Sequence, residues 1–340
     1  MYYFSEHNER GNHAGTKARN DVETILQKNG AIPVNSNIFI LRSDETENHI
    51  YSNIQNRFDL IRLFGDLWRI KGKKVLIQYP MLAFDFQKTY FEKIAKHNEL
   101  VLLVHDLHSL RIPDAQKQKE EIELLNIASA IIVHNRFMEQ KIRSMGVLVP
   151  KVYDLELFDY LYDGKKNENF DSKNSIAFAG NLSKSVFLSE LVEKNPTIEF
   201  QFYGVGWNSE YQGQNVHYCG NFKPEVIPEK LSARYGLVWD GDSVMSGSGA
   251  LGEYTRINNP HKLSLYLAAG IPVIVWREAA VAEVVQKYGV GIALERIDHL
   301  EEVLANISEQ NYSEMKQNTE KIREKLIKGE YLERILKQLQ

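Results

Sequence analysis

NNPHKLSLYLAAGIPVIVW, residues 258–276, joins a polar loop, a short helical pattern and a buried apolar run in immediate succession. Pro260 suits the first turn of a helix, Gly270 suits a C-terminal cap, and the run from Ile271 predicts a strand. A helix N-terminus offers unpaired N–H groups and a positive dipole end, so Lys262 in this first turn indicates an anion. We interpret the stretch as a seat for a nucleotide diphosphate; an ordinary loop, helix and strand unit is the alternative.

Helical and strand patterns alternate along nearly the whole chain. Apolar, β-branched runs predict strands at residues 1–4, 37–41, 75–79, 100–107, 130–134, 175–179, 197–203, 216–219, 236–239, 271–276 and 291–294. Amphipathic patterns predict helices at residues 14–26, 51–70, 84–97, 116–128, 136–145, 186–194, 224–232 and 279–288, and only helices after residue 299. This alternation requires parallel strands joined by right-handed crossovers, so the predicted fold class is α/β with doubly wound sheets.

A polar segment at residues 160–175 separates two similar halves. It predicts a domain boundary there, with one doubly wound domain at residues 1–160 and a second at 161–330. Doubly wound domains bind ligands at the carboxyl ends of their strands. For two such domains facing across a cleft, we therefore expect the ligand-binding residues to follow directly after the strands.

Composition excludes several classes of protein. The chain of 340 residues has a net charge of -4 and 43% hydrophobic residues, typical of a globular protein that binds no nucleic acid. Cys219 is the only cysteine, and no Cys/His spacing resembles a metal site. The N-terminus lacks a signal-peptide pattern and no apolar run is long enough for a transmembrane segment, so we expect a cytoplasmic location.

The predicted strand at 100–107 runs into His105 and Asp106. An imidazole beside a carboxylate is a candidate acid/base pair, because the carboxylate can orient the ring and raise its basicity. In the alternative, Asp106 caps the following turn and His105 packs at the sheet edge.

Two other strand ends carry glycines that let a backbone approach a phosphate. After residue 179 come Gly180, Asn181 and Lys184, although Ser183 there also suits a plain N-cap. After residue 202, Tyr203 and Gly204 start like a dinucleotide fingerprint. The third glycine of that fingerprint is missing, which argues against a nicotinamide or flavin site but leaves this pair as a contact for a base or ribose.

Three further candidates lie around the 258–276 stretch. Asp240, in Asp-Gly-Asp, has a spacing compatible with a metal but more typical of a turn. The glycine-rich run that follows predicts a loop that closes on a ligand, with Tyr254 and Arg256 as its contacts. Glu283, near the start of the next helix, is a candidate acceptor of ribose hydroxyls or a solvated surface residue.

Several of these segments together resemble the GT-B glycosyltransferases. The similarity is strongest in GLVWDG (236–241), NNPHKLS (258–264) and AGIPVI (269–274), and extends to HDL (105–107) with LR (110–111) and to GNL (180–182). The group that these segments resemble contains bacterial β-1,6-galactofuranosyltransferases and the glucosyltransferases of serine-rich-repeat adhesins.

The resemblance implies two Rossmann-like domains and transfer of a hexose (glucose, galactose or galactofuranose) from a UDP-sugar to a glycan, glycolipid or glycoprotein acceptor. It assigns the acceptor to residues 1–160 and the donor to 161–330, with Asn259 and Lys262 on the diphosphate. It also implies that residues 331–340 form a helix that returns to the first domain, and that no metal or other cofactor is needed. The alternative function is a non-catalytic glycan-binding or transferase-partner protein of the same fold; the oligomeric state is left open.

Overall fold

A computed structural model describes residues 1–6, 14–34, 65, 69–81, 87–112, 114–167, 173–208 and 213–339. The chain forms two compact units. Unit 1 contains Met1–Gly11, Arg19–Leu155 and Ile335–Gln340, and unit 2 contains Asn12–Ala18 and Glu156–Arg334. The main division therefore falls between Leu155 and Glu156, and two short segments belong to the unit that is distant in sequence.

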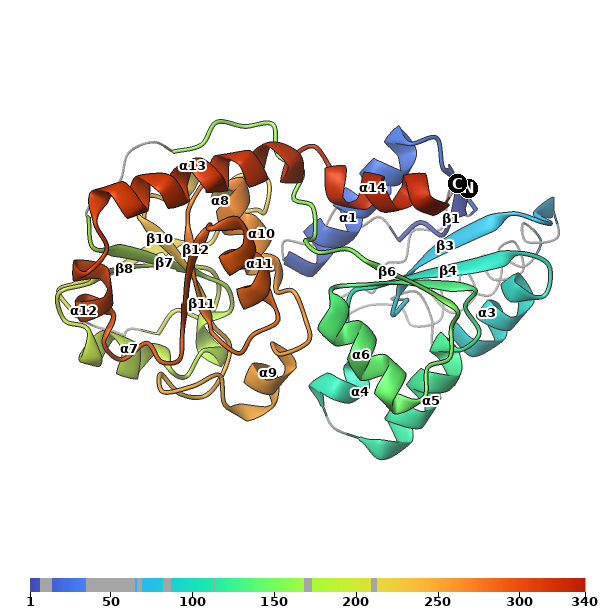
Figure 1. The fold of residues 1–340 in the computed structure, drawn as a ribbon, viewed down its shortest axis with the longest axis horizontal. Coiled ribbons are helices and arrows are strands. Elements are labelled where there is room, and N and C mark those ends of the chain that lie inside the picture. The colour runs from blue at the N-terminus through green and yellow to red at the C-terminus, as the bar shows by residue number, and fades with distance from the viewer. Residues whose placement is uncertain are drawn as a thin grey trace, which may run out of the picture. The chain divides into compact units, whose positions relative to one another are not determined.

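Unit 1 is built on a six-stranded parallel sheet with the order β2-β1-β3-β4-β5-β6. Its strands are β1 (Tyr2–Tyr3), β2 (Ile32–Pro33), β3 (Lys74–Tyr79), β4 (Glu99–Val104), β5 (Ala130–Val133) and β6 (Lys151–Asp154). Its helices are α3 (Gln87–Ala95), α4 (His108–Arg111), α5 (Ala115–Leu125), α6 (Arg136–Met145) and, from Arg19 onward, α1 (Ala14–Lys28). Figure 1 shows α3, α5 and α6 on one face of this sheet and α1 with α14 (Glu330–Leu339) on the other. Both faces are covered, which explains why β4 and β5 are almost continuously apolar and buried.

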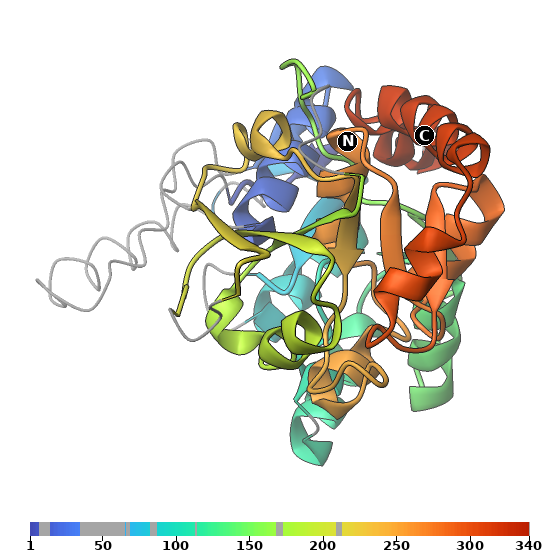
Figure 2. The ribbon, with the colours of Figure 1, turned by 90° about the vertical axis from the view of Figure 1, so that its left-hand side faces the viewer.

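Unit 2 has a second six-stranded parallel sheet, with the order β12-β11-β10-β7-β8-β9. Its strands are β7 (Ser175–Ala179), β8 (Glu199–Tyr203), β9 (Val216–Gly220), β10 (Tyr235–Val238), β11 (Val273–Trp276) and β12 (Gly291–Leu294). Its helices are η1 (Leu182–Lys184), α7 (Leu188–Lys194), α8 (Ile227–Lys230), α9 (Gly249–Tyr254), α10 (His261–Ala268), α11 (Val281–Tyr288), α12 (Leu300–Ala305) and α13 (Glu309–Leu326). Figures 1 and 2 show α7 and α8 on opposite sides of the strands.

The prediction of two doubly wound parallel sheets is confirmed. Local chemistry sets the helix limits: Asn135 caps α6 by accepting from two backbone N–H groups, and Gly146 ends it with φ +106°. Gly270, as predicted, follows α10 in the left-handed region, with φ +72°.

Some predicted limits were wrong. The predicted strand at 100–107 ends at Val104, and β2 and β6 were not predicted at all. The glycine-rich run contains α9 where only a loop was expected. The predicted strand at 37–41, and all but residues 65, 69 and 70 of the predicted helix at 51–70, lie outside the described residues.

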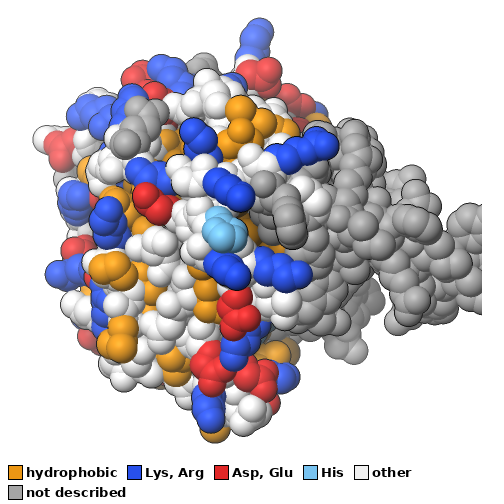
Figure 3. Space-filling model, turned by 90° about the vertical axis from the view of Figure 1, so that its right-hand side faces the viewer, with side chains coloured by type: hydrophobic (Ala, Val, Ile, Leu, Met, Phe, Trp, Pro, Cys, Tyr) orange, Lys and Arg blue, Asp and Glu red, His pale blue; other side chains and the backbone are white. Residues whose placement is uncertain are grey.

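Surface charge agrees with the near-neutral composition. On the face in Figure 3, Lys and Arg side chains are interspersed with Asp, Glu and apolar side chains over the described residues. Among the helices described, none has both the length and the apolar character needed to cross a bilayer.

Candidate functional site

Lys262 extends from the first turn of α10 across the carboxyl ends of β7 and β10. Its Nζ lies 2.8 Å from Oδ1 of Asp240 and 3.3 Å from the carbonyl oxygen of Trp239. The ammonium also lies 4.5 Å from the centroid of the Phe178 ring. The side chains of Lys262 and Asp240 keep 18% and 31% of their exposure, so this ion pair is only partly withdrawn from solvent. Lys262 therefore lies in the first turn of α10, with its ammonium next to the carboxyl ends of β7 and β10.

Gly180 and Gly204 form a tight pair of turns beside this lysine. A Cβ on Gly180 would lie 3.3 Å from Cε of Lys262. Gly204 has φ +128°, and a Cβ there would lie 1.9 Å from the carbonyl oxygen of Gly180. Only glycine fits at position 204, and the turn after β7 therefore packs directly against the turn after β8.

The other candidates near these turns contribute differently. Tyr203 is buried, and its hydroxyl donates to Oε1 of Gln201 at 2.9 Å, so the ring belongs to the core and only its backbone borders the turn. Burial raises the pKa of its phenol. Asn181 caps η1, with Oδ1 accepting from the Ser183 hydroxyl at 2.7 Å and from the Lys184 N–H at 3.3 Å. The Lys184 side chain is exposed.

Three further candidates lie elsewhere along unit 2 in sequence: Asn259, Tyr254 and Glu283. Asn259 is buried, and its Nδ2 donates to the carbonyl oxygen of Glu156 at 2.9 Å. Tyr254 is buried at the end of α9, whereas Glu283 is exposed in the first turn of α11. The contacts of unit 2 bring together Lys262, Asp240, Gly180 and Gly204.

The glycine-rich segment before α10 is packed. A Cβ on Gly247 would lie 2.4 Å from the Trp276 ring, and one on Gly252 would lie 2.2 Å from the Gly247 carbonyl oxygen. Val244, in the same loop, is fully buried, and its carbonyl oxygen accepts from the Ile297 N–H at 2.7 Å. These glycines allow close packing within the segment. From the sequence alone, glycines that are needed for packing cannot be told from glycines that make a loop mobile.

In unit 1, His105 and Asp106 follow β4 and take different partners. Nε2 of His105 lies 2.7 Å from Oε1 of Gln78, a residue of β3. Asp106 forms an ion pair with Arg111 at 2.7 Å. We expected a carboxylate to orient the His105 ring, but the partner of its Nε2 is the side-chain amide of Gln78. Sequence reasoning missed Gln78 because a single glutamine in an apolar strand carries no functional signal.

A second histidine lies at the adjacent strand end. His134 is buried after β5, with Nε2 3.0 Å from the carbonyl oxygen of Val104. Burial lowers its pKa to about 4, although the nearby Asp106 carboxylate acts in the opposite direction. The ring is therefore neutral near pH 7.

Metal ligands do not cluster in the part of the chain that the structure describes: no group of three or more His, Cys, Asp or Glu side chains is arranged to hold an ion. Asp240 faces Lys262, while the carboxylate of Asp242 lies against Gly249. The two aspartates of the Asp-Gly-Asp motif therefore have separate neighbours.

The fold is that of the GT-B glycosyltransferases, as comparison with solved structures shows. A sucrose-phosphate synthase from Thermosynechococcus elongatus superposes with a TM-score of 0.62 at 12% identity, covering 99% of this chain and 98% of that one. An Escherichia coli structure described as trehalose-6-phosphate bound with UDP-2-fluoro glucose has a TM-score of 0.59 at 10% identity, covering 99% of this chain and 98% of that one. At these identities the likeness establishes the fold.

Sequence comparison then establishes the family. Residues 1–157 match the N-terminal domain and residues 176–339 the C-terminal domain of the Glucosyltransferase 3-like family. The chain is 30% identical to the beta-1,6-galactofuranosyltransferase WbbI of Escherichia coli (strain K12), covering 100% of this chain and 98% of that protein. It is 25% identical to Glucosyltransferase 3 of Streptococcus gordonii, covering 94% of this chain and 92% of that protein. The chain belongs to the Glucosyltransferase 3-like family and is a glycosyltransferase.

Proposed function

We propose that the protein transfers a hexose from a UDP-sugar to a glycan or glycoprotein acceptor. Unit 2 binds the donor and unit 1 supplies the residues that activate the acceptor hydroxyl. The observation that carries the donor assignment is the position of Lys262. This residue belongs to the first turn of α10, and its side chain lies beside the glycine turn at Gly180. A cation, a helix N-terminus and a turn without side chains are three features that suit a diphosphate.

The chemistry follows from the charge that develops during transfer. The acceptor oxygen forms a bond to the anomeric carbon of the hexose while the bond from that carbon to the diphosphate oxygen breaks. The electron pair of the broken bond leaves with UDP. Lys262 and the N–H groups of α10 stabilise this growing negative charge, and such preorganised groups act most strongly where charge develops.

Metal-independent transfer is part of the proposal. Its support is that Lys262 already supplies a positive charge at the strand ends, with Asp240 paired to it at 2.8 Å. The rest of the cationic environment comes from the dipole of α10. Assays in the presence of EDTA test this, because a metal-dependent enzyme would stop.

Lys262→Met keeps the aliphatic side chain and removes the charge. We expect kcat/KM for the preferred UDP-sugar to fall by about 100-fold or more, as happens when a group that stabilises transition-state charge is removed. Lys194→Met is the matched control, since Lys194 is an exposed lysine at the end of α7 in the same unit. The measurement is a UDP-release assay over a panel of UDP-hexoses, with thermal unfolding to show that the variants fold. Full activity in Lys262→Met would refute the diphosphate role.

A further inference from the structure

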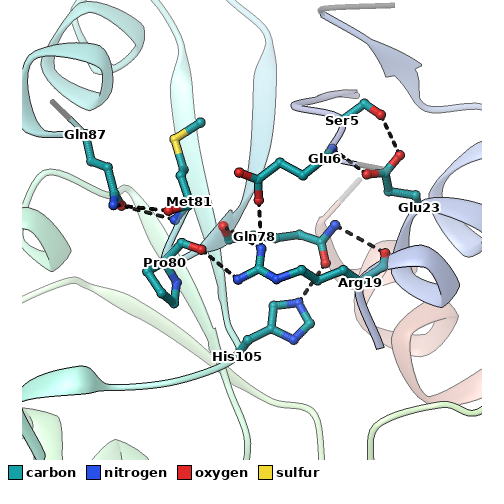
Figure 4. A network of polar contacts seen from close by, with 9 residues as sticks. All are labelled: Ser5, Glu6, Arg19, Glu23, Gln78, Pro80, Met81, Gln87 and His105. Atoms are coloured by element: carbon teal, nitrogen blue, oxygen red, sulfur yellow. Dashed lines mark hydrogen bonds and ion pairs between the residues drawn. The ribbon is translucent and has the colours of Figure 1, made fainter. Parts of the chain in front are cut away.

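The strongest unassigned feature of unit 1 is a buried polar network that ends on His105 (Figure 4). We propose that Gln78 is a positioning residue, whose amide forces the neutral His105 ring to carry its hydrogen on Nε2 and its lone pair on Nδ1. The role of His105 in acceptor activation rests on the proposed function. The assignment of its proton does not, because it follows from hydrogen bonding alone.

The two ends of the Gln78 amide have different partners. Its Nε2 donates to the carbonyl oxygen of Arg19 at 3.3 Å, and its Oε1 lies 2.7 Å from Nε2 of His105. A backbone carbonyl can only accept, so the NH₂ end of the amide must face Arg19. The oxygen end then faces the imidazole, and an amide oxygen can only accept as well. Nε2 of His105 must therefore carry hydrogen, and in the neutral ring the lone pair is on Nδ1.

The neighbours of Gln78 keep the amide from turning over. The Arg19 guanidinium donates to the Pro80 carbonyl oxygen at 2.6 Å and to Oε2 of Glu6 at 2.7 Å. The backbone N–H of Glu6 donates in turn to Oε1 of Glu23 at 2.5 Å. Gln78 is only 1% exposed, and Arg19, Glu6 and Glu23 are also buried. Reversing the amide would place its oxygen against the Arg19 carbonyl oxygen and leave both acceptors without a hydrogen, a loss that a buried site cannot compensate with water.

The network has a direct consequence for proton transfer. In the proposed reaction the hydroxyl proton of the acceptor passes to Nδ1 of His105 as the acceptor oxygen bonds to the anomeric carbon. The resulting imidazolium carries hydrogen on both nitrogens, and Nε2 continues to donate to the amide oxygen of Gln78. That hydrogen bond becomes charge-assisted and therefore stronger, so Gln78 favours the protonated ring without itself exchanging a proton.

Nitrogen NMR of the full-length protein with ¹⁵N-labelled histidine reads the tautomer directly and needs no activity. The His105→Gln variant identifies the His105 signals by their loss. We expect a protonated Nε2 and an unprotonated Nδ1 in the neutral ring, and the reverse pattern would overturn the proposal. In Gln78→Met, which keeps the length of the side chain but has no amide, we expect the signals to move toward an average of both tautomers. Unchanged signals in that variant would also overturn it.

Kinetics separate a positioning role from a general loss of stability. Gln78→Met is expected to lower kcat by about 10- to 100-fold with KM for the UDP-sugar unchanged, because the donor binds unit 2. Gln87→Met is the matched control: among the residues that the structure describes, its amide bonds to the backbone of Met81, at 3.1 and 3.3 Å, within the same region of unit 1. A Gln78→Met enzyme with normal kcat would refute the positioning role. Normal activity in His105→Gln would instead refute the role of His105 in the proposed function and leave the tautomer standing.

Discussion

Lys262 is paired with the carboxylate of Asp240, and this pairing bears on how the proposed site binds an anion. The Lys262 to Asp240 ion pair is partly exposed, and such pairs contribute roughly 1 kcal/mol or less. In the proposed complex a diphosphate bonds to the same ammonium and is repelled by Asp240. On this proposal the carboxylate holds the lysine beside the glycine turn and at the same time weakens binding of the product nucleotide.

Asp240→Asn separates these two effects. We expect UDP alone to bind about fivefold more tightly, because roughly 1 kcal/mol of repulsion is removed. Isothermal titration calorimetry with UDP measures the change. Asp242→Asn is the control, since Asp242 is exposed and its carboxylate lies against Gly249. Weaker UDP binding by Asp240→Asn would mean that Asp240 contacts the nucleotide itself.

The position of Lys262 depends on how closely α10 packs on β10. A Cβ on Gly236 of β10 would lie 2.2 Å from the ring of Tyr266 in α10. Tyr266 is fully buried, and its hydroxyl accepts from the Ala179 N–H at 2.8 Å, which links the helix to β7. The absence of a side chain at Gly236 therefore allows α10 to pack closely on the sheet.

Gly236→Ala is expected to push α10 away from the sheet. Overpacking of this kind costs about 1–3 kcal/mol, and Lys262 moves with the helix. We expect a lower denaturation midpoint and weaker UDP binding together. In the double variant Gly236→Ala with Tyr266→Leu, the smaller side chain leaves room for the methyl group. The loss in free energy of unfolding of the double variant should therefore be smaller than the sum of the losses of the two single variants. Strict additivity would contradict the proposed contact.

The sequence predicts the elements that have strong local signals and misses those that depend on tertiary contacts. Pro260 and Gly270 bracket α10, so the helix and the placement of Lys262 follow from local chemistry. β2 contains Pro33 and is an edge strand of two residues, a place where proline is tolerated but where no apolar run marks a strand. The role of Gln78 depends on Arg19, which is 59 residues away in sequence.

Each unit contains a buried histidine whose ionisation opposes folding. Burial lowers the pKa of His134 in unit 1 to about 4 and that of His261 in unit 2 to about 3, the latter also through the charge of Lys17. His261 stacks on Tyr160, with ring centroids 5.1 Å apart. In the unfolded chain both rings take up a proton near pH 6.5, so the unfolded state binds more protons below that pH.

The whole protein should therefore lose stability as the pH falls from about 6.5 toward 4. The expected loss is about 3 kcal/mol for His134, and folded-state protonation ends its contribution below about pH 4. Carboxylates with lowered pKa values, such as Glu156, remain ionised over most of this range. Scanning calorimetry at several pH values measures the slope. His134→Asn should flatten it whatever the variant does to absolute stability, and an unchanged slope would contradict the assignment.

The assignment of Ile335–Gln340 to unit 1 has a consequence for biosynthesis. Ile335, Leu336 and Leu339 are buried, and the Leu339 carbonyl oxygen accepts from Nζ of Lys74. A ribosome makes these residues only after all of unit 2. Unit 1 is therefore synthesised before the segment that completes its core, and part of its apolar surface stays exposed until residues 335–340 have been made. We expect a nascent chain that is stalled before residue 335 to bind chaperones that recognise exposed apolar surface.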